Sequence, residues 1–264
     1  MPRYSLKTDK FILYQLAVQS ADAEARFIDR VYRKEYGRPA ALFREDFSGT
    51  CLISCEWVKL RPNNHAYCVD LDKPTLRWGL VHNIRPLPKR AAARVHQMNR
   101  DVCRVARPKV HVVGAFNFSY FVFKKRPQLV RYFKAVRRSL LKDGLFILDA
   151  YGGWESQEVL REKTKLKGFT YVWDQADYNP IDDHTVCHIH FKFPDGTTMK
   201  RAFTYHWRLW TLGGIRDALA EAGFRRTDVY WEGDDGKGAG NGIYRRQNRA
   251  ENSPGWNAYI VAIP

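Results

Sequence analysis

Carboxylate side chains are scarce in the middle of this 264-residue chain. Between Lys73 and Lys142 there are 18 lysines and arginines but a single acid, Asp101. The net charge of +16 arises mainly in the first half: residues 1–132 carry 25 basic and 11 acidic residues, and residues 133–264 carry 19 and 17. This excess indicates either a polyanionic partner or a generally basic surface spread over several helices.

Long apolar runs and paired cysteines are also missing. No stretch of 18 or more apolar residues occurs, so no membrane span is expected. The N-terminal residues lack the apolar segment of a secretory signal. The five cysteines are scattered and include no Cys-x-x-Cys pair, which argues against a disulfide framework. We therefore expect a cytoplasmic protein with reduced thiols, as a monomer or homodimer.

Short apolar segments alternate with helical patterns along most of the chain. Residues 1–38 have helical spacing, and strands are predicted near 41–46, 66–70, 93–98, 110–116 and 145–150, with helices between them. This alternation predicts an α/β fold with a doubly wound, mostly parallel sheet. Period-two patterns predict an antiparallel insert at about 168–210. A helix at 211–222, two closing strands at 227–231 and 256–263, and a mobile loop at 233–255 complete the prediction.

Acidic residues end three successive predicted strands. Glu45 and Asp46 end the first, Asp70 follows the second, and Asp101 lies just after the third. The carboxyl ends of parallel strands meet at one edge of a sheet, where carboxylates can bind ribose hydroxyls and an adenine amine. The pattern thus indicates a nucleoside cofactor.

The order of these parts resembles the class I S-adenosylmethionine-dependent methyltransferases over nearly the whole chain. The resemblance implies a seven-stranded sheet, an N-terminal helical cap at 1–38 and a methyltransferase domain at 39–264. The family's acid-x-Gly-x-Gly-x-Gly loop falls on residues 45–51, where only Gly49 of the three glycines is present.

The resemblance implies S-adenosyl-L-methionine as the cofactor and S-adenosyl-L-homocysteine as its product. Asp70 would bind the ribose and Asp101 the adenine amine. As alternatives, Asp70 could cap a helix and Asp101 could pair with Arg100 or Arg104. The implied cofactor-binding residues are Glu45, Asp46, Phe47, Ser48, Gly49, Thr50, Asp70, Leu71, Asp101, Val102 and Asn117, with the choice between Glu45 and Asp46 left open.

The exit of the fourth strand carries Asn117 and Tyr120, with the spacing Asn-x-x-Tyr. This resembles the Asn-Pro-Pro-Tyr loop of methyltransferases that modify amines of nucleic-acid bases, although the prolines are absent. In that loop the tyrosine stacks on the base, which the resemblance implies for Tyr120. Tyr120 and Tyr14 are the predicted catalytic residues, and a tyrosine or histidine near this loop would act if a proton must be removed. A nucleic acid is the alternative substrate to a small molecule.

The insert supplies most of the residues predicted to bind substrate. Its aromatics could cage a cationic amine or simply form a core. His188-x-His190 could ligate a metal, but no third ligand follows at a suitable spacing, so no metal is predicted. The predicted substrate-binding residues are Tyr151, Trp173, Tyr178, His190, Tyr205 and Arg208.

These patterns predict methylation of a nitrogen or oxygen on a small molecule. An RNA or DNA methyltransferase, or a protein that binds S-adenosylmethionine without catalysis, is the alternative. A nicotinamide-dependent dehydrogenase is disfavoured because its glycine fingerprint is missing.

Overall fold

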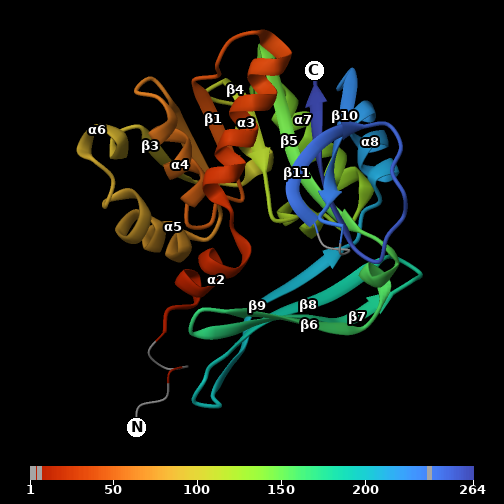
Figure 1. Cartoon of the computed structure of the whole chain (residues 1–264). Helices are drawn as coiled ribbons and strands as arrows, with labels where there is room; N and C mark the ends of the chain where they lie inside the picture. Colours follow the sequence, from red (N-terminus) through yellow and green to blue (C-terminus); the bar gives the residue numbers. More distant parts are fainter. Residues whose placement is uncertain (1–3, 5–7, 237–239) are drawn as a thin grey trace.

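A central eight-stranded sheet, covered by helices on both faces, lies across from a separate four-stranded antiparallel sheet (Figure 1). This computed structural model describes residue 4, residues 8–236 and residues 240–264. In spatial order, the central strands are β11 (Gly240–Gln247), β10 (Arg226–Asp234), β12 (Trp256–Ile263), β5 (Leu140–Gly152), β4 (Val110–Ala115), β1 (Leu42–Asp46), β2 (His65–Asp70) and β3 (Val95–Asn99).

The sheet confirms the predicted doubly wound α/β architecture. Strands β1 to β5 pair in parallel, whereas β12, β10 and β11 pair in an antiparallel manner. The predicted count of seven strands was wrong, because part of the expected mobile loop at 233–255 is strand β11. Its residue Tyr244 pairs in register with Glu232 of β10. The rest of that prediction includes residues 237–239, which lie outside the described part of the chain.

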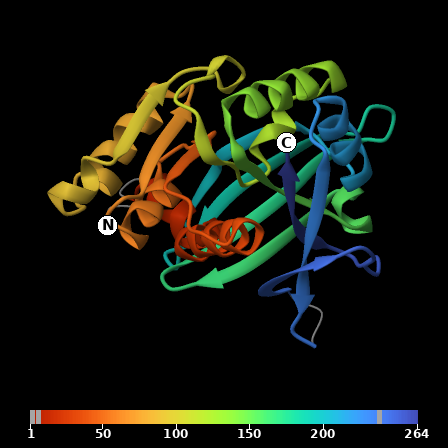
Figure 2. The same ribbon diagram turned by 90° about the horizontal axis from the view of Figure 1, so that it is seen from above.

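The helices form two layers around the sheet. Helices α3 and α4 lie on one face and α7 and α8 on the other (Figure 2). Within the described residues, none of the helices has the length and apolar character needed to cross a membrane. The helical segments are α2 (Lys10–Val18), α3 (Ala21–Tyr36), α4 (Leu52–Leu60), α5 (Lys73–Gly79), η1 (Leu80–Ile84), α6 (Lys89–Ala92), η2 (Val102–Arg104), η3 (Ser119–Val122), α7 (Arg126–Ser139), η4 (Trp154–Gln157) and α8 (Leu212–Glu221).

Strand alternation divides the core into two layers. On β4, Val112 packs in the layer of α3 and α4, and Val113 packs in the layer of α7 and α8. Phe27 and Ile28 of α3 are buried in the first layer, so this helix packs on the sheet itself. The division of the chain at residues 38 and 39 into cap and domain stays a prediction.

The antiparallel sheet lies opposite the carboxyl ends of the parallel strands (Figure 1). Its strands are β6 (Leu160–Leu166), β7 (Phe169–Asn179), β8 (His184–Lys192) and β9 (Thr198–Arg208). The predicted insert at 168–210 contains β7, β8 and β9 but omits β6. That strand alternates charged residues on one face with mixed residues on the other, so its sequence carries no apolar period. Backbone pairing with β7 holds it in place.

Helix α2 bridges the two sheets. Leu13 packs among phenylalanines of the insert, and Tyr14 lies 4.9 Å from Phe203 of β9, measured between ring centroids. On the other side, Gln15 Nε2 donates to Thr50 Oγ1 at 2.8 Å, in the loop that follows β1. The N-terminal segment thereby reaches both sides of the space between the sheets.

Candidate functional site

The loop after β1 has an unusual backbone. Phe47, Gly49 and Cys51 have φ angles of 56°, 49° and 62°, so every second residue is left-handed. A non-glycine residue in this region costs about 1 kcal/mol or more, and such strain persists only where the surroundings require the shape. These are the three positions where the resembled motif has glycine. The loop thus keeps a conformation suited to three glycines while only Gly49 remains.

Neighbouring elements press on this loop and define its shape. Gly79 at the end of α5 packs directly on it, because a Cβ there would lie 2.7 Å and 2.9 Å from the backbone C and Cα of Thr50. Asn83 Nδ2 also donates to the Thr50 carbonyl at 2.8 Å. Neither contact could be predicted from the sequence, because both join segments that are close only in the folded chain.

Asp70 links the end of β2 to the same loop. Its Oδ2 accepts from the Gly49 amide at 2.7 Å, and its Oδ1 accepts from the Asp72 amide at 2.8 Å. Burial raises the pKa of Asp70, although these amide hydrogen bonds oppose the rise. A carboxylate has about four acceptor positions, so lone pairs remain for ribose hydroxyls. Asp72, and not Asp70, caps α5, since it accepts from Thr75.

Asp101 lies at the neighbouring strand end. Asp70 and Asn99 are register partners in β2 and β3, and the Arg100 amide donates to the Asp70 carbonyl at 3.1 Å. The sheet therefore brings the two predicted acids to one edge. Asp101 also accepts from the Cys103 amide at 2.8 Å and forms a long ion pair with Arg104 at 3.7 Å, as the charge-partner alternative anticipates.

The hydrophobic residues that follow these acids have different environments. Leu71 is 71% exposed beside Asp70, where an apolar side chain can contact a flat ring. Val102 is buried in the core layer of α7 and α8. Of the two, only Leu71 has a surface open to a ligand.

Glu45 and Asp46, which the sequence could not separate, point to opposite faces of β1. Glu45 accepts from the amide and hydroxyl of Ser54 in α4, at 3.0 Å and 2.5 Å. Asp46 forms a fully buried ion pair with Arg44, at 2.8 Å, and accepts from Tyr132 at 3.0 Å. Glu45 thus supports the helix that follows the loop, and Asp46 belongs to the core.

An acid that the sequence reasoning missed shapes the exit of β4. Asp149 of β5 accepts from the backbone amides of Asn117 and Phe118, at 2.6 Å and 2.9 Å. Both donors are left-handed, with φ angles of 56° and 55°. Burial raises the pKa of Asp149 to about 7, although the two amides oppose the rise. Asp149 therefore holds this turn in a strained conformation that directs Asn117 toward the space between the sheets.

A cavity of about 1030 Å³ fills part of that space. Asn117 and Phe118 line it from the central sheet, and Tyr14 lines it from α2. Aromatic rings provide much of its wall: Phe118 and Tyr151 lie 4.7 Å apart, measured between centroids, and Phe118 lies 6.3 Å from Trp207 of the insert. The cavity is thus closed by the two sheets together.

Comparisons with known proteins identify the fold. No protein-family model matches the chain, and a search of curated proteins finds no match. Solved structures do match. An S-adenosylmethionine-dependent methyltransferase from Clostridium acetobutylicum superposes with a TM-score of 0.69 at 15% identity, over 96% of this chain and 97% of that one. The chain has the fold of an S-adenosylmethionine-dependent methyltransferase.

Two further structures share this methyltransferase fold. The amino pentose methyltransferase CalS10 from Micromonospora echinaspora has a TM-score of 0.67 at 13% identity and covers 100% of this chain and 99% of its own. The sugar N-methyltransferase KedS8 from a Streptoalloteichus species has a TM-score of 0.65 at 16% identity, with coverages of 97% and 92%.

Not every predicted catalytic or substrate residue reaches the cavity of the methyltransferase fold. Tyr120 is completely buried, and its hydroxyl donates to the Asp149 carbonyl at 2.7 Å. It can neither stack on a base nor accept a proton, so its predicted catalytic role is not supported. Tyr14, Tyr151, Trp173 and Tyr205 do line the cavity.

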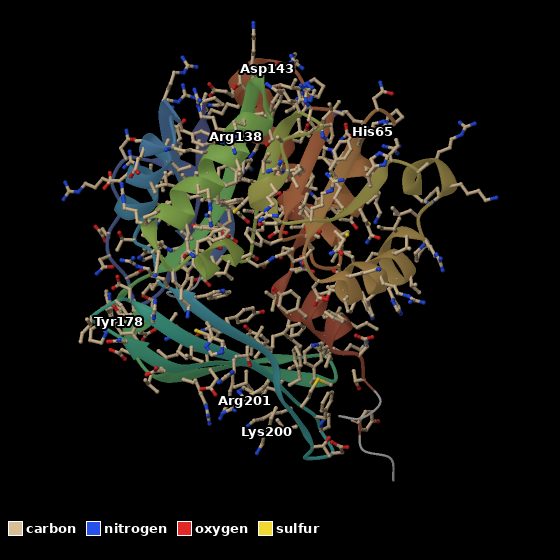
Figure 3. The ribbon with its side chains drawn as sticks, turned by 180° about the vertical axis from the view of Figure 1, so that it is seen from behind. His65, Arg138, Asp143, Tyr178, Lys200 and Arg201 are labelled. Carbon is tan, nitrogen blue, oxygen red and sulfur yellow. The ribbon has the colours of Figure 1, made fainter. Side chains whose placement is uncertain are left out.

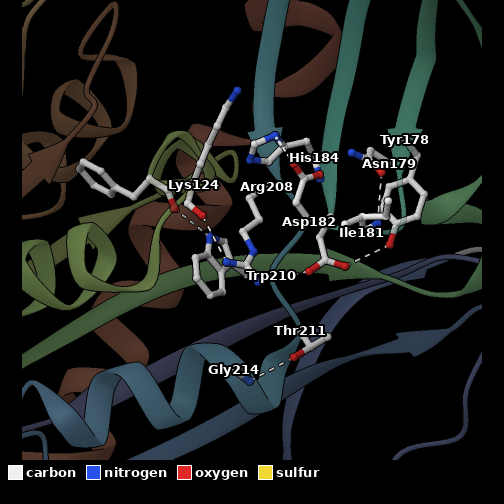
Figure 4. A network of polar contacts seen from close by, with 12 residues as sticks. Lys124, Tyr178, Asn179, Ile181, Asp182, His184, Arg208, Trp210, Thr211 and Gly214 are labelled. Atoms are coloured by element: carbon white, nitrogen blue, oxygen red, sulfur yellow. Dashed lines mark hydrogen bonds and ion pairs between the residues drawn. The ribbon is translucent and has the colours of Figure 1, made fainter.

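Tyr178, His190 and Arg208 lie outside the cavity lining. Tyr178 is at the far end of the antiparallel sheet, where its hydroxyl donates to Asp183 at 3.1 Å (Figure 3). Arg208 lies over the Trp210 ring at 4.2 Å and donates to the Lys124 carbonyl (Figure 4). The Arg208 contact with Lys124 joins the insert to the loop before α7, and the Tyr178 contact stays within the insert. Both contacts are structural.

His190 does not point toward a ligand site either. Its Nε2 contacts Asp174 Oδ2 at 3.0 Å, and its Nδ1 accepts from the Arg201 amide. The preceding histidine of the pair, His188, contacts Thr204 at 2.9 Å. Both side chains are therefore engaged with groups of the insert.

A buried acid on α3 completes the surroundings of the site. Glu24 is 8% exposed, and its Oε2 has no hydrogen-bond partner among the described residues. Burial, followed by repulsion from Asp149 and Glu45, raises the pKa of Glu24 to about 8. Burial likewise raises the pKa of Glu45 to about 8. Glu24 of α3 thus lies within electrostatic reach of carboxyl groups from β1 and β5, and a cation bound beside these groups would favour their ionised forms.

Proposed function

We propose that this protein transfers a methyl group from S-adenosylmethionine to a nitrogen or oxygen of a small molecule. The observation that carries the proposal is the left-handed loop at residues 47–51, which is hydrogen-bonded to Asp70, together with the neighbouring aromatic cavity. Asp101 follows the strand that pairs with the strand of Asp70. One side fits a nucleoside cofactor, and the other fits an acceptor of moderate size.

Different residues are proposed to bind the ribose, the adenine and the methionine part of the cofactor. Asp70 accepts hydrogen bonds from the ribose, Asp101 accepts one from the adenine amine, and Leu71 contacts the adenine ring. The backbone of residues 47–51 lies along the methionine part, where the left-handed residues turn amides and carbonyls toward the ligand. The positive sulfonium and ammonium groups would favour the ionised forms of Glu24, Glu45 and Asp149, whose pKa values burial raises.

S-adenosylmethionine supplies an electrophilic methyl group when bound, so the protein chiefly aligns the acceptor and excludes water. Alignment alone can contribute about 7–11 kcal/mol to the barrier reduction. Burial raises the pKa of Tyr14 well above its usual range, so its hydroxyl stays protonated and acts as a hydrogen-bond donor. Tyr14 is thus proposed to position the acceptor rather than to remove a proton.

The alternatives lose part of their support in this arrangement. A nucleic-acid methyltransferase rests on the net charge of +16 and on the loop from Asn117 to Tyr120, and the Tyr120 side chain is buried in the core. Binding without catalysis was favoured by the missing glycines, but the loop retains the backbone shape that those glycines would permit. Small-molecule methylation therefore accounts for more of the site.

The test is methyl transfer from S-adenosylmethionine labelled in its methyl group. The purified protein would be incubated with a panel of small amines and alcohols and, separately, with transfer RNA and double-stranded DNA. We expect label in one or more small molecules, located by mass spectrometry. Label in nucleic acid alone would contradict the choice of substrate, and S-adenosylmethionine binding with no transfer to any acceptor would favour a binding protein.

A further inference from the structure

The cavity between the sheets has the opposite charge balance from the chain as a whole. The sequence has 44 basic and 28 acidic residues. Among the described residues that line the cavity, five are acidic and one is basic: Glu155, Glu162, Glu232, Asp234 and Glu251, with Arg249 as the cation. The basic character of the protein is therefore kept out of the space in which a substrate would lie.

Strand β6 shows how the chain sorts these charges. Leu160 and Glu162 line the cavity. Because side chains alternate along a strand, the three basic residues of β6 lie on its opposite face: Arg161, Lys163 and Lys165. On that outer face Arg161 Nε forms an ion pair with Asp174 at 2.8 Å. One strand thus points a carboxylate inward and all its cations outward.

The inward carboxylate lies beside an aromatic wall and is free to bind. Glu162 is the register partner of Trp173 on β7. The Trp173 ring lies 6.2 Å from Tyr205 and 6.3 Å from Trp207, between centroids. No described residue donates a hydrogen bond to the Glu162 side chain or forms an ion pair with it. Carboxylates and aromatic faces both attract a cation, whereas an anion would be repelled.

We propose that the substrate of this cavity carries a positively charged amine on a flat or apolar frame, with the amine held between Glu162 and the face of Trp173. This inference rests on the proposed function and narrows its substrate class from small molecules in general to cationic amines. The acidic lining of the cavity would repel polyanions, even though the outer surface of the protein is basic.

Three indole compounds that differ in charge provide the test: tryptamine, tryptophol and indole-3-acetate. Each would be titrated by calorimetry into the full-length protein saturated with S-adenosylhomocysteine. We expect tryptamine to bind at least about tenfold more tightly than the neutral alcohol, from combined carboxylate and ring attraction, and the anion to bind most weakly. Equal binding of all three, tighter binding of the anion, or no binding of tryptamine would overturn the proposal.

The variant E162Q and its control E158Q locate the effect. Glu158 is exposed on the same connection but lies outside the cavity lining. We expect E162Q to weaken tryptamine about threefold, with tryptophol unchanged, and E158Q to alter neither. An unchanged tryptamine affinity in E162Q would contradict the assigned position. Titration of S-adenosylhomocysteine alone tests the proposed function separately. The relative affinities of the three indole compounds can also be measured on the unliganded protein, so failure of the proposed function and failure of this inference are distinguishable.

Discussion

Buried carboxyl groups are the residues with the most consequence for how the protein responds to pH. Glu24 and Glu45 have pKa values raised to about 8, and Asp149 has one raised to about 7. A folded-state pKa above the unfolded value means that the folded state holds a proton that the unfolded state has lost. Stability contributed in this way is complete below about pH 4.5 and is lost as the pH rises toward 8.

Replacing Glu24 by glutamine removes one such group. Between pH 6 and pH 8, the free energy of unfolding of the unliganded wild-type protein should fall by about 2 kcal/mol more than that of E24Q. Urea unfolding at the two pH values measures this difference. E158Q changes an exposed glutamate in the same way and should follow the wild type; parallel losses in E24Q and wild type would refute the role given to Glu24.

The left-handed residue Cys51 offers a second test at this scale. Cys51 and Cys55 are both buried, but only Cys51 has a positive φ, of 62°. A β-branched residue is strongly disfavoured there. C51V should therefore lose about 1–2 kcal/mol more stability than C55V and should bind S-adenosylhomocysteine more weakly. Thermal unfolding and calorimetry would detect both effects, and equal behaviour of the two variants would show that the loop is not constrained.

Among the secondary-structure elements, those with a clear apolar period could be predicted from the sequence. The five parallel strands and helix α8 lie where alternation and helical spacing place them. Strands β6 and β11 could not be found, because their side chains are mostly polar and exposed and only backbone pairing to a neighbour makes them strands. The roles of Gly79 and Asp149 were missed for a related reason, since each depends on a contact between distant segments.

Contact between helix α5 and the loop after β1 predicts an unusual response to alanine. Gly79 has ordinary helical angles, φ −58° and ψ −38°, so alanine would normally be favoured there. Its Cβ would instead overlap the Thr50 backbone. G79A should lower stability by about 1–3 kcal/mol and weaken S-adenosylhomocysteine binding.

Gly213 in α8 is the matched control, because a Cβ there meets nothing within 4 Å. G213A should raise stability by about 0.5–1 kcal/mol. Thermal unfolding of the two variants compares them directly. If both substitutions stabilised the protein, the close packing of α5 on the loop would not hold in solution.

For the whole molecule, the arrangement of layers decides how charge and function are distributed. The helices on the two faces of the central sheet carry the basic block at residues 73–142, including Arg138 of α7 (Figure 3). The cavity lies between the carboxyl ends of the strands and the insert, and none of the described lysines and arginines of this block lines it. A net charge of +16 therefore says little about the substrate, and the sequence alone could not separate a basic surface from a basic site.

Titration calorimetry of S-adenosylhomocysteine into the wild-type protein and into D70N tests whether an adenosyl group binds at the ends of these strands. We expect saturable binding to the wild type at one site per chain. D70N should weaken that binding by about tenfold to a hundredfold, since hydrogen bonds to a charged acceptor contribute about 1.5–3 kcal/mol. Failure of the wild type to bind, or undiminished binding by a correctly folded D70N, would contradict the placement of an adenosyl group across the ends of β1, β2 and β3.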